Sequence, residues 1–135
     1  MDDKELVDFA TKLFDFARNG DMNLVDYVGE GLNVNLVNEN GQSFVMLAAY
    51  HGHAELVAAL AKAGADVNLL NDRGQSPLAG AVFKKEDAVI DALLAAGADP
   101  QAGSPSALDT ARMFERADLV ERFTADSGAA GAAGE

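Results

Sequence analysis

The chain has 135 residues, of which 49% are hydrophobic, so it is long enough for one domain with a buried core. Its formal net charge of −12 argues against nucleic acid and anionic membrane surfaces as partners, because both bind clustered Lys and Arg. The absence of cysteine excludes disulfides, thiolate catalysis and cysteine-based zinc sites. The charge leaves a basic protein partner open, although solubility alone is its simpler explanation.

The N-terminal residues 1–5 lack the basic start and apolar run of a signal peptide. No apolar stretch reaches the length that a bilayer span requires. We therefore expect a cytoplasmic protein.

The first predicted element is an amphipathic helix near the N-terminus. Its apolar residues recur at helical spacing: Leu6, Phe9, Ala10, Leu13, Phe14 and Ala17. This helix is longer and more aromatic than those predicted after it. Such a helix suits an end cap, because a terminal repeat has only one neighbour to pack against.

An internal repeat of 33 residues runs through the middle of the chain. Gly41-Gln42-Ser43 recurs as Gly74-Gln75-Ser76, and Gly64-Ala65-Asp66 recurs as Gly97-Ala98-Asp99; 74 − 41 and 97 − 64 both give 33. A further copy begins at Ser106 after a loss of three residues in the connection. With an earlier copy before residue 38, the predicted repeats cover about 4–37, 38–70, 71–101 and 102–124.

Each copy predicts two short helices followed by an extended connection. Ser43, Ser76 and Ser106 each precede a helix and can cap it by accepting a backbone N–H. The second helix of the second copy is predicted over 53–63. Gly64 and Gly97 are expected to end their helices in the left-handed conformation. The stretch 71–74 is expected to turn a finger, with Gly74 at positive φ.

The last copy combines a polar outer face with an apolar inner one, as an end cap should. The polar residues are Arg112, Glu115, Arg116, Asp118, Glu121 and Arg122, and the apolar ones are Leu108, Ala111, Leu119, Val120 and Phe123. Beyond them the chain is almost entirely Gly and Ala. We predict a single domain over 1–126 and a flexible tail over 127–135.

These recurring segments resemble the ankyrin repeat, whose period is 33 residues. The resemblance covers about residues 4–124 and implies an all-α solenoid of stacked helix-turn-helix units with hairpin-like fingers. The family's Thr-Pro-Leu-His stretch reads Ser43-Phe44-Val45-Met46 in one copy and Ser76-Pro77-Leu78-Ala79 in the next. The bridging histidine is therefore absent from both, and Lys85-Glu86 replaces Gly-His in the third copy. These departures put some hydrogen bonds between repeats in doubt.

The resemblance implies a protein-binding module, either adaptor or inhibitor, that acts through a concave helical face and the finger tips. By position the binding residues are Glu39, Asn40, Gln42, Tyr50, His51, Asp72, Arg73, Gln75, Phe83 and Lys84, with Arg18 and Met113 extending the strip. The partner is a protein of unknown identity, and we expect a monomer. The alternative is a structural accessory that stabilises a partner enzyme.

Tyr50 and Phe83 are the sharpest binding candidates, because they occupy equivalent positions and aromatic side chains anchor interfaces. The alternative is that each only covers the core of the adjacent repeat. Lys84 and Lys85 form the one basic pair. A solvated helix end explains that pair most simply, and an acidic partner is the other explanation.

Neither catalysis nor metal binding finds support in the sequence. His51 and His53, with Glu55 nearby, supply too few ligands for a zinc site, and no other histidine is present. The serines have no histidine base beside them and are read as helix caps. The glycines fall where repeats end, not in a phosphate loop. We expect no enzyme activity, no cofactor and no metal.

Overall fold

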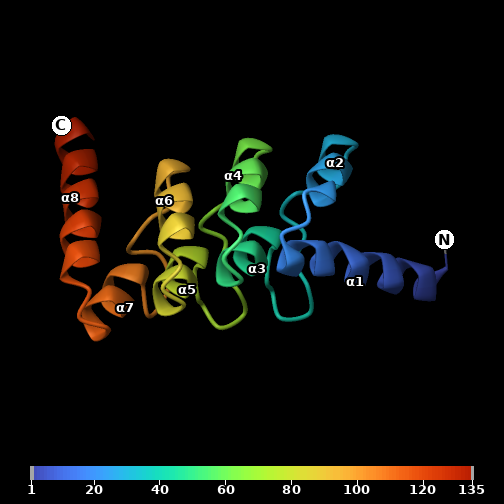
Figure 1. Ribbon diagram of the computed structural model, residues 1–135, viewed down its shortest axis with the longest axis horizontal. Coiled ribbons are helices and arrows are strands. Elements are labelled where there is room, and N and C mark those ends of the chain that lie inside the picture. The colour runs from blue at the N-terminus through green and yellow to red at the C-terminus, as the bar shows by residue number, and fades with distance from the viewer. Residues whose placement is uncertain (1, 135) are drawn as a thin grey trace.

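The computed structural model describes residues 2–134, with side chains described for residues 2–125. Within this part the chain forms eight α-helices and no strand: α1 Asp3–Asn19, α2 Asn23–Gly29, α3 Phe44–Tyr50, α4 Ala54–Lys62, α5 Pro77–Phe83, α6 Asp87–Ala95, α7 Ala107–Met113 and α8 Ala117–Gly134. Figure 1 shows α1, α3, α5 and α7 as one row, which we call the inner row. Helices α2, α4, α6 and α8 form a second row above it, the outer row. The predicted all-α stack of helix pairs is therefore confirmed.

The three serines start their helices as the sequence predicts. The hydroxyl of Ser43 accepts the N–H of the residue three positions on, and so do those of Ser76 and Ser106, each at 3.1 Å. All three serines are buried. Such a cap stabilises a helix by about 1 kcal/mol, which is large for helices of seven residues.

Glycines end the second helices in the predicted left-handed conformation. Gly64 has a φ of 102° and Gly97 a φ of 89°. The second helix of the second repeat, α4, is one residue shorter at each end than the predicted 53–63. Gly74, in the finger turn, has a φ of 75°, which also agrees with the prediction.

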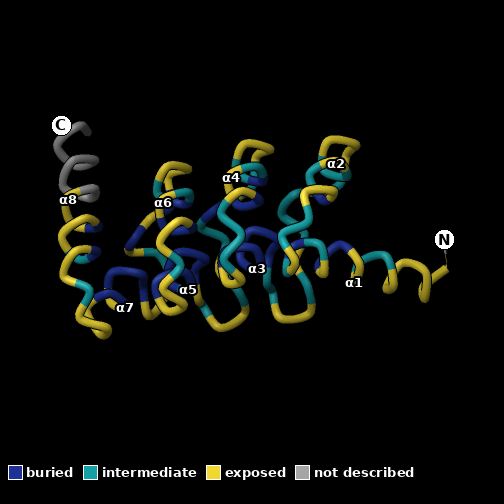
Figure 2. Tube along the Cα trace, viewed as in Figure 1, coloured by how far each residue is buried: buried dark blue, intermediate teal, exposed yellow. Residues whose placement is uncertain are grey.

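The core lies between the two rows of helices, as the buried segments in Figure 2 show. The inner row contributes alanines that are completely buried: Ala17, Ala48, Ala49, Ala81 and Ala111. Their small side chains let α1, α3, α5 and α7 pack closely against one another. The outer row contributes larger residues, such as Leu60 and Leu93, both 0% exposed. Truncating one of these to Ala is expected to cost about 2–5 kcal/mol of stability.

Polar contacts join successive repeats near the ends of the second helices. The side-chain oxygen of Asn35 accepts the backbone N–H of Asp66 at 2.8 Å, and that of Asn68 accepts the N–H of Asp99 at the same distance. The 31-residue separation is identical in the two bonds, so they repeat with the stack.

The two end helices α1 and α8 differ from the internal ones. α1 spans 17 residues, and in Figure 1 its N-terminal part extends beyond the neighbouring helices. Leu6, placed on the predicted apolar face, is consequently 51% exposed, whereas Leu13 and Ala17 are buried. The backbone of α8 is helical to Gly134, where the sequence predicts a flexible tail over 127–135. Side chains beyond 125 and residue 135 lie outside the described part, so that flexibility stays a prediction.

Of the helices in the described part of the chain, none combines the length and apolar character needed to cross a bilayer.

Candidate functional site

Two fingers project from the inner row of helices, on the side away from the outer row (Figure 1). In the first, Asn38 donates its backbone N–H to the carbonyl of Gln42, and in the second Asn71 does the same to Gln75, both at 3.0 Å. The asparagine side chains repeat this pairing, since each Nδ2 donates to the glutamine Oε1. The fingers are therefore closed turns held by the same Asn–Gln pair.

The fingers also bind each other. The backbone N–H of Asp72 donates to the carbonyl of Asn40 at 3.1 Å, which joins the tips of the two fingers. The next connection lacks three residues, and there Ser104 donates its N–H to the carbonyl of Gly74 at 3.0 Å. The stack thus presents two joined fingers followed by a shorter loop.

A groove of about 500 Å³ lies between these loops and the inner helices. We call it the finger groove. It is lined by Gln42, Met46, Tyr50, Asn71, Arg73, Gln75, Ser76, Pro77, Ala79, Gly80, Phe83, Pro105, Thr110 and Met113. Its walls are thus finger amides on one side and apolar helix residues from α3, α5 and α7 on the other.

The finger groove brings together six of the residues singled out in the sequence: Gln42, Tyr50, Arg73, Gln75, Phe83 and Met113. Glu39, Asn40 and Asp72 lie exposed at the finger tips, outside the groove. His51 and Lys84 follow the ends of α3 and α5 and do not line it. Arg18 is also outside it and pairs with Asp15 at 2.9 Å.

The aromatic candidates lie at the surface. Tyr50 is 40% exposed and Phe83 56% exposed, while the alanines beside them are buried. Lys84 places its Nζ 5.0 Å from the centre of the Tyr50 ring, within the range of a cation–π contact. Phe83 meets the ring of Phe114 edge-on at 5.7 Å. The Tyr50 ring also meets the His51 ring edge-on at 5.5 Å. Both rings have flanking neighbours and still keep much of their surface exposed.

Sequence reasoning missed several residues of the groove. Met46, Ala79 and Thr110 face it from the inner helices, about one turn before the predicted positions at the helix ends. Gly80 lies opposite Tyr50, so that a Cβ at this position would stand 3.6 Å from the tyrosine Cδ2. Met46 and Ala79 occupy equivalent repeat positions, and so extending the period one turn back from Tyr50 and Phe83 could have found them.

His51, at the C-terminal end of α3, lies near the cationic side chains of Arg18 and Lys84. Partial burial lowers the pKa of His51 below its ordinary value. His53, Arg18 and Lys84 lower that pKa further, because each disfavours a second positive charge beside it. Both causes favour the neutral form of His51.

His53 has a structural role. Its Nε2 lies 2.7 Å from the carbonyl oxygen of Arg18 in the preceding repeat, and because a carbonyl can only accept, the ring donates there. This bond joins the first and second repeats. Across residues whose side chains are described, no three His, Cys, Asp or Glu side chains gather as a metal site would require.

A second hollow, of about 380 Å³, lies at the N-terminal end of the stack. It is lined by Lys12, Phe16, Asn23, Asp26, Tyr27 and Glu30. Lys12 already covers the Phe16 ring at 5.7 Å, and that ring stacks on Tyr27. The hollow is smaller, and its aromatic rings already contact one another, so the finger groove is the stronger candidate site.

The fold and the groove define this chain as a helical repeat protein with a surface groove between its loops and inner helices. The family model described as "Ankyrin repeats (3 copies)" matches residues 13–104. The chain belongs to the ankyrin-repeat family, whose repeats are generally protein-interaction modules.

A putative ankyrin repeat protein of Pseudomonas aeruginosa is 46% identical to the chain over 56 residues. That alignment covers 41% of this chain and 33% of the relative, so the chain matches about a third of the relative's length. The name of this relative specifies neither a partner nor a reaction.

Proposed function

We propose that this chain is a non-catalytic, cytoplasmic module that binds a partner protein in the finger groove. The observation that carries the proposal is the exposed apolar surface of Tyr50, Phe83 and Met113, the last of them 64% exposed. These side chains line one groove on three successive inner helices. Aromatic and Met side chains are enriched at the centres of protein interfaces.

Tyr50 and Phe83 are not part of the buried core. The alanines that pack the inner helices, such as Ala49 and Ala81, are fully buried, whereas Tyr50 and Phe83 lie outside the buried core at 40% and 56% exposed. A large side chain kept at the surface without a packing role is a candidate for contact with another molecule. This argument favours binding over the alternative that the rings only cover the adjacent repeat.

The test is affinity capture from the source cell's lysate, with the Tyr50→Ala/Phe83→Ala double variant beside the wild type. We expect a protein that the wild type recovers and the folded double variant loses. The matched control is Leu6→Ala/Val7→Ala, which removes exposed apolar side chains (51% and 64% exposed) from α1, outside the groove. This control should capture the same protein as the wild type.

Circular dichroism of all three proteins checks that the fold survives. If helicity collapses in the double variant, Tyr50 and Phe83 are core residues and the groove is the wrong face. Equal losses in the double variant and the α1 control would show general adhesion to apolar surface. A captured enzyme that becomes insoluble without this chain would point to the accessory role instead.

A further inference from the structure

The charged side chain in the lining of the finger groove is a cation, although the protein as a whole carries a net charge of −12. Among the described residues that line it, Arg73 is the only charged one. Lys84 stands at its edge, over the ring of Tyr50, which does line it. Lys85 follows directly and is exposed. The groove thus has one arginine in its lining, one lysine at its edge and no carboxylate in its lining.

These cations lack carboxylate partners, unlike the arginines on the inner helices. Arg18 is paired with Asp15 on α1, and Arg112 lies 3.7 Å from Asp109 on α7. Within the described part of the chain, Arg73 and Lys84 make no ion pair within 4.0 Å. Their charges are therefore available to a ligand, and pairing with it would break no existing ion pair.

The finger amides add hydrogen-bond donors to the same groove. Gln42 and Gln75 each use the side-chain oxygen to accept from an asparagine of their own finger. Each glutamine Nε2 then remains as a donor with two hydrogens. A ligand that meets these groups must supply acceptor oxygens, which carboxylates do best.

The net negative charge of the molecule repels an acidic ligand, whereas Arg73 and Lys84 attract it. Distance decides which of these two effects is stronger. Charges more than about 8 Å apart are largely screened at physiological ionic strength. A carboxylate seated in the groove meets Arg73 or Lys84 at contact distance, where screening is weak. The local cations therefore decide which ligand fits, while the acidic remainder of the surface discourages such ligands from binding elsewhere.

We propose that the finger groove binds a short acidic segment of a partner protein, in which an aromatic or aliphatic side chain is flanked by carboxylates. The apolar side chain packs between Tyr50 and Phe83, and the carboxylates pair with Arg73 and Lys84. This assignment rests on the proposed function and adds the chemistry of the partner.

The test is selection of peptides from a random displayed library on the immobilised full-length chain. Two variants run in parallel. Arg73→Glu/Lys84→Glu reverses the groove charges, and Lys4→Glu/Lys62→Glu makes the same change in net charge at exposed sites outside the groove. The wild type and the control should enrich peptides with Asp or Glu beside an apolar residue. The groove variant should lose that preference and gain Lys and Arg.

A synthetic copy of the best peptide gives the size of the effect. Its Kd should rise about tenfold or more on the groove variant, because two attractive pairs become repulsive, and stay within about twofold on the control. Equal weakening on both variants would overturn the proposal, since net charge alone would then explain it.

The remaining outcomes separate this inference from the proposed function. Peptides that depend on Tyr50 and Phe83 but carry no acidic preference overturn the acidic partner and leave the binding groove standing. If the wild type enriches no peptide that the Tyr50→Ala/Phe83→Ala variant loses, both proposals fail. Dimers that light scattering detects in the wild type and not in the groove variant would overturn the acidic segment by making a second copy the occupant.

Discussion

Two junctions between repeats occupy the same place in the stack and are built from different chemistry. Where α3 and α4 meet the first repeat, Gly20 ends α1 with a φ of 70° and the His53 ring lies against it. Where α7 and α8 meet the third repeat, the equivalent positions hold Lys85, with a φ of 59°, and Arg116. The repeat geometry therefore demands a left-handed residue after the first helix, whether or not that residue is glycine.

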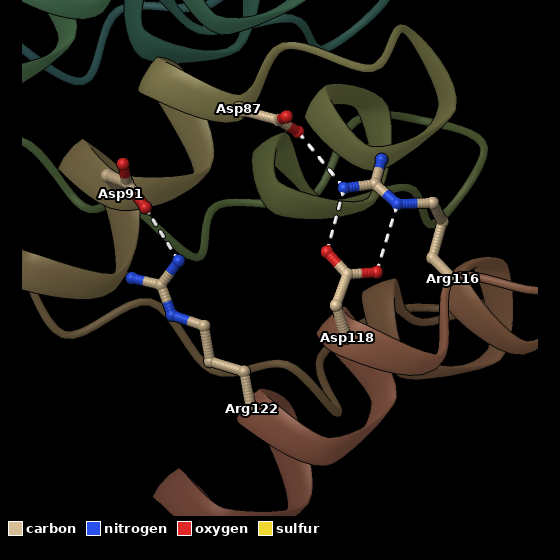
Figure 3. Close-up of polar contacts among 5 residues, drawn as sticks. All are labelled: Asp87, Asp91, Arg116, Asp118 and Arg122. Atoms are coloured by element: carbon tan, nitrogen blue, oxygen red, sulfur yellow. Dashed lines mark hydrogen bonds and ion pairs between the residues drawn. The ribbon is translucent and has the colours of Figure 1, made fainter.

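The two junctions also differ in what bridges them. The first uses one short bond, from His53 to the carbonyl of Arg18. The second uses two ion pairs, which Figure 3 shows: Arg116 lies 3.2 Å from Asp87, and Arg122 lies 2.6 Å from Asp91. Arg116 also pairs with Asp118 of its own repeat, at 3.1 Å. Their aspartates are mostly exposed, so these pairs are expected to stabilise the C-terminal repeat only weakly.

Between them lies an intermediate case. A Cβ on Gly52 would stand 2.7 Å from the carboxylate of Glu86, which occupies the position of His53 one repeat later. From the N-terminal to the C-terminal junction, the residue at this position thus changes from His to Glu to Arg. The comparison teaches that the backbone conformation is constant while the side-chain chemistry of the junction varies.

Breaking the first junction should have the largest effect. In Gly20→Ala, the new Cβ would stand 2.5 Å from the His53 Nδ1, at a φ that disfavours any side chain. We expect a loss of about 2–4 kcal/mol in the free energy of unfolding, from backbone strain and a displaced hydrogen bond. Urea denaturation followed by circular dichroism measures it.

The control for that prediction is Gly97→Val. Gly97 also has a positive φ, 89°, but a Cβ there would meet nothing within 4 Å. The free energy of unfolding of Gly97→Val should fall by about 1–3 kcal/mol from backbone strain alone, because a β-branched residue is strongly disfavoured at positive φ. An unchanged melting temperature for Gly97→Val would contradict the helix end assigned to it, and a Gly20→Ala loss smaller than that of Gly97→Ala would contradict the role of His53.

Relieving the strain at the third repeat sharpens the comparison in the opposite direction. Lys85→Gly places glycine where the first two repeats already have it. A left-handed backbone destabilises a non-glycine residue by about 1–2 kcal/mol, and relieving it is partly offset by about 0.5–1 kcal/mol because glycine has more conformational entropy in the unfolded chain. The free energy of unfolding of the variant should therefore rise by about 0.5–1 kcal/mol, measured by the same denaturation. Lys85→Ala, which keeps the strain and removes the charge, is its control.

Removing the ion pairs of Arg116 at the second junction should have the smallest effect. Arg116→Ala is expected to lower the melting temperature by less than Gly97→Val does, and the difference from wild type should shrink in high salt. The hydrogen bond from Arg116 holds the pKa of Asp118 below its ordinary value. That contribution is complete above the ordinary pKa of an aspartate and is lost as pH falls through the lowered one. An Arg116→Ala effect that grows at acidic pH would contradict it.

The sequence alone determined the architecture and much of the candidate site. The 33-residue period, the serine caps and the helix-ending glycines are local signals, because each acts on the backbone within a few residues of itself. The period also pointed to Tyr50 and Phe83. These two residues occupy equivalent positions, so a single repeat geometry exposes both.

Only the tertiary structure decided how neighbouring repeats combine. The contact of Lys84 with the Tyr50 ring, the bond between the two finger tips and the approach of Gly80 to the Tyr50 ring each join residues of different repeats. The left-handed backbone at Lys85 is likewise imposed by the stack, since a lysine has no local preference for it. Such features depend on the spacing and rotation between repeats, which the period of the sequence does not contain.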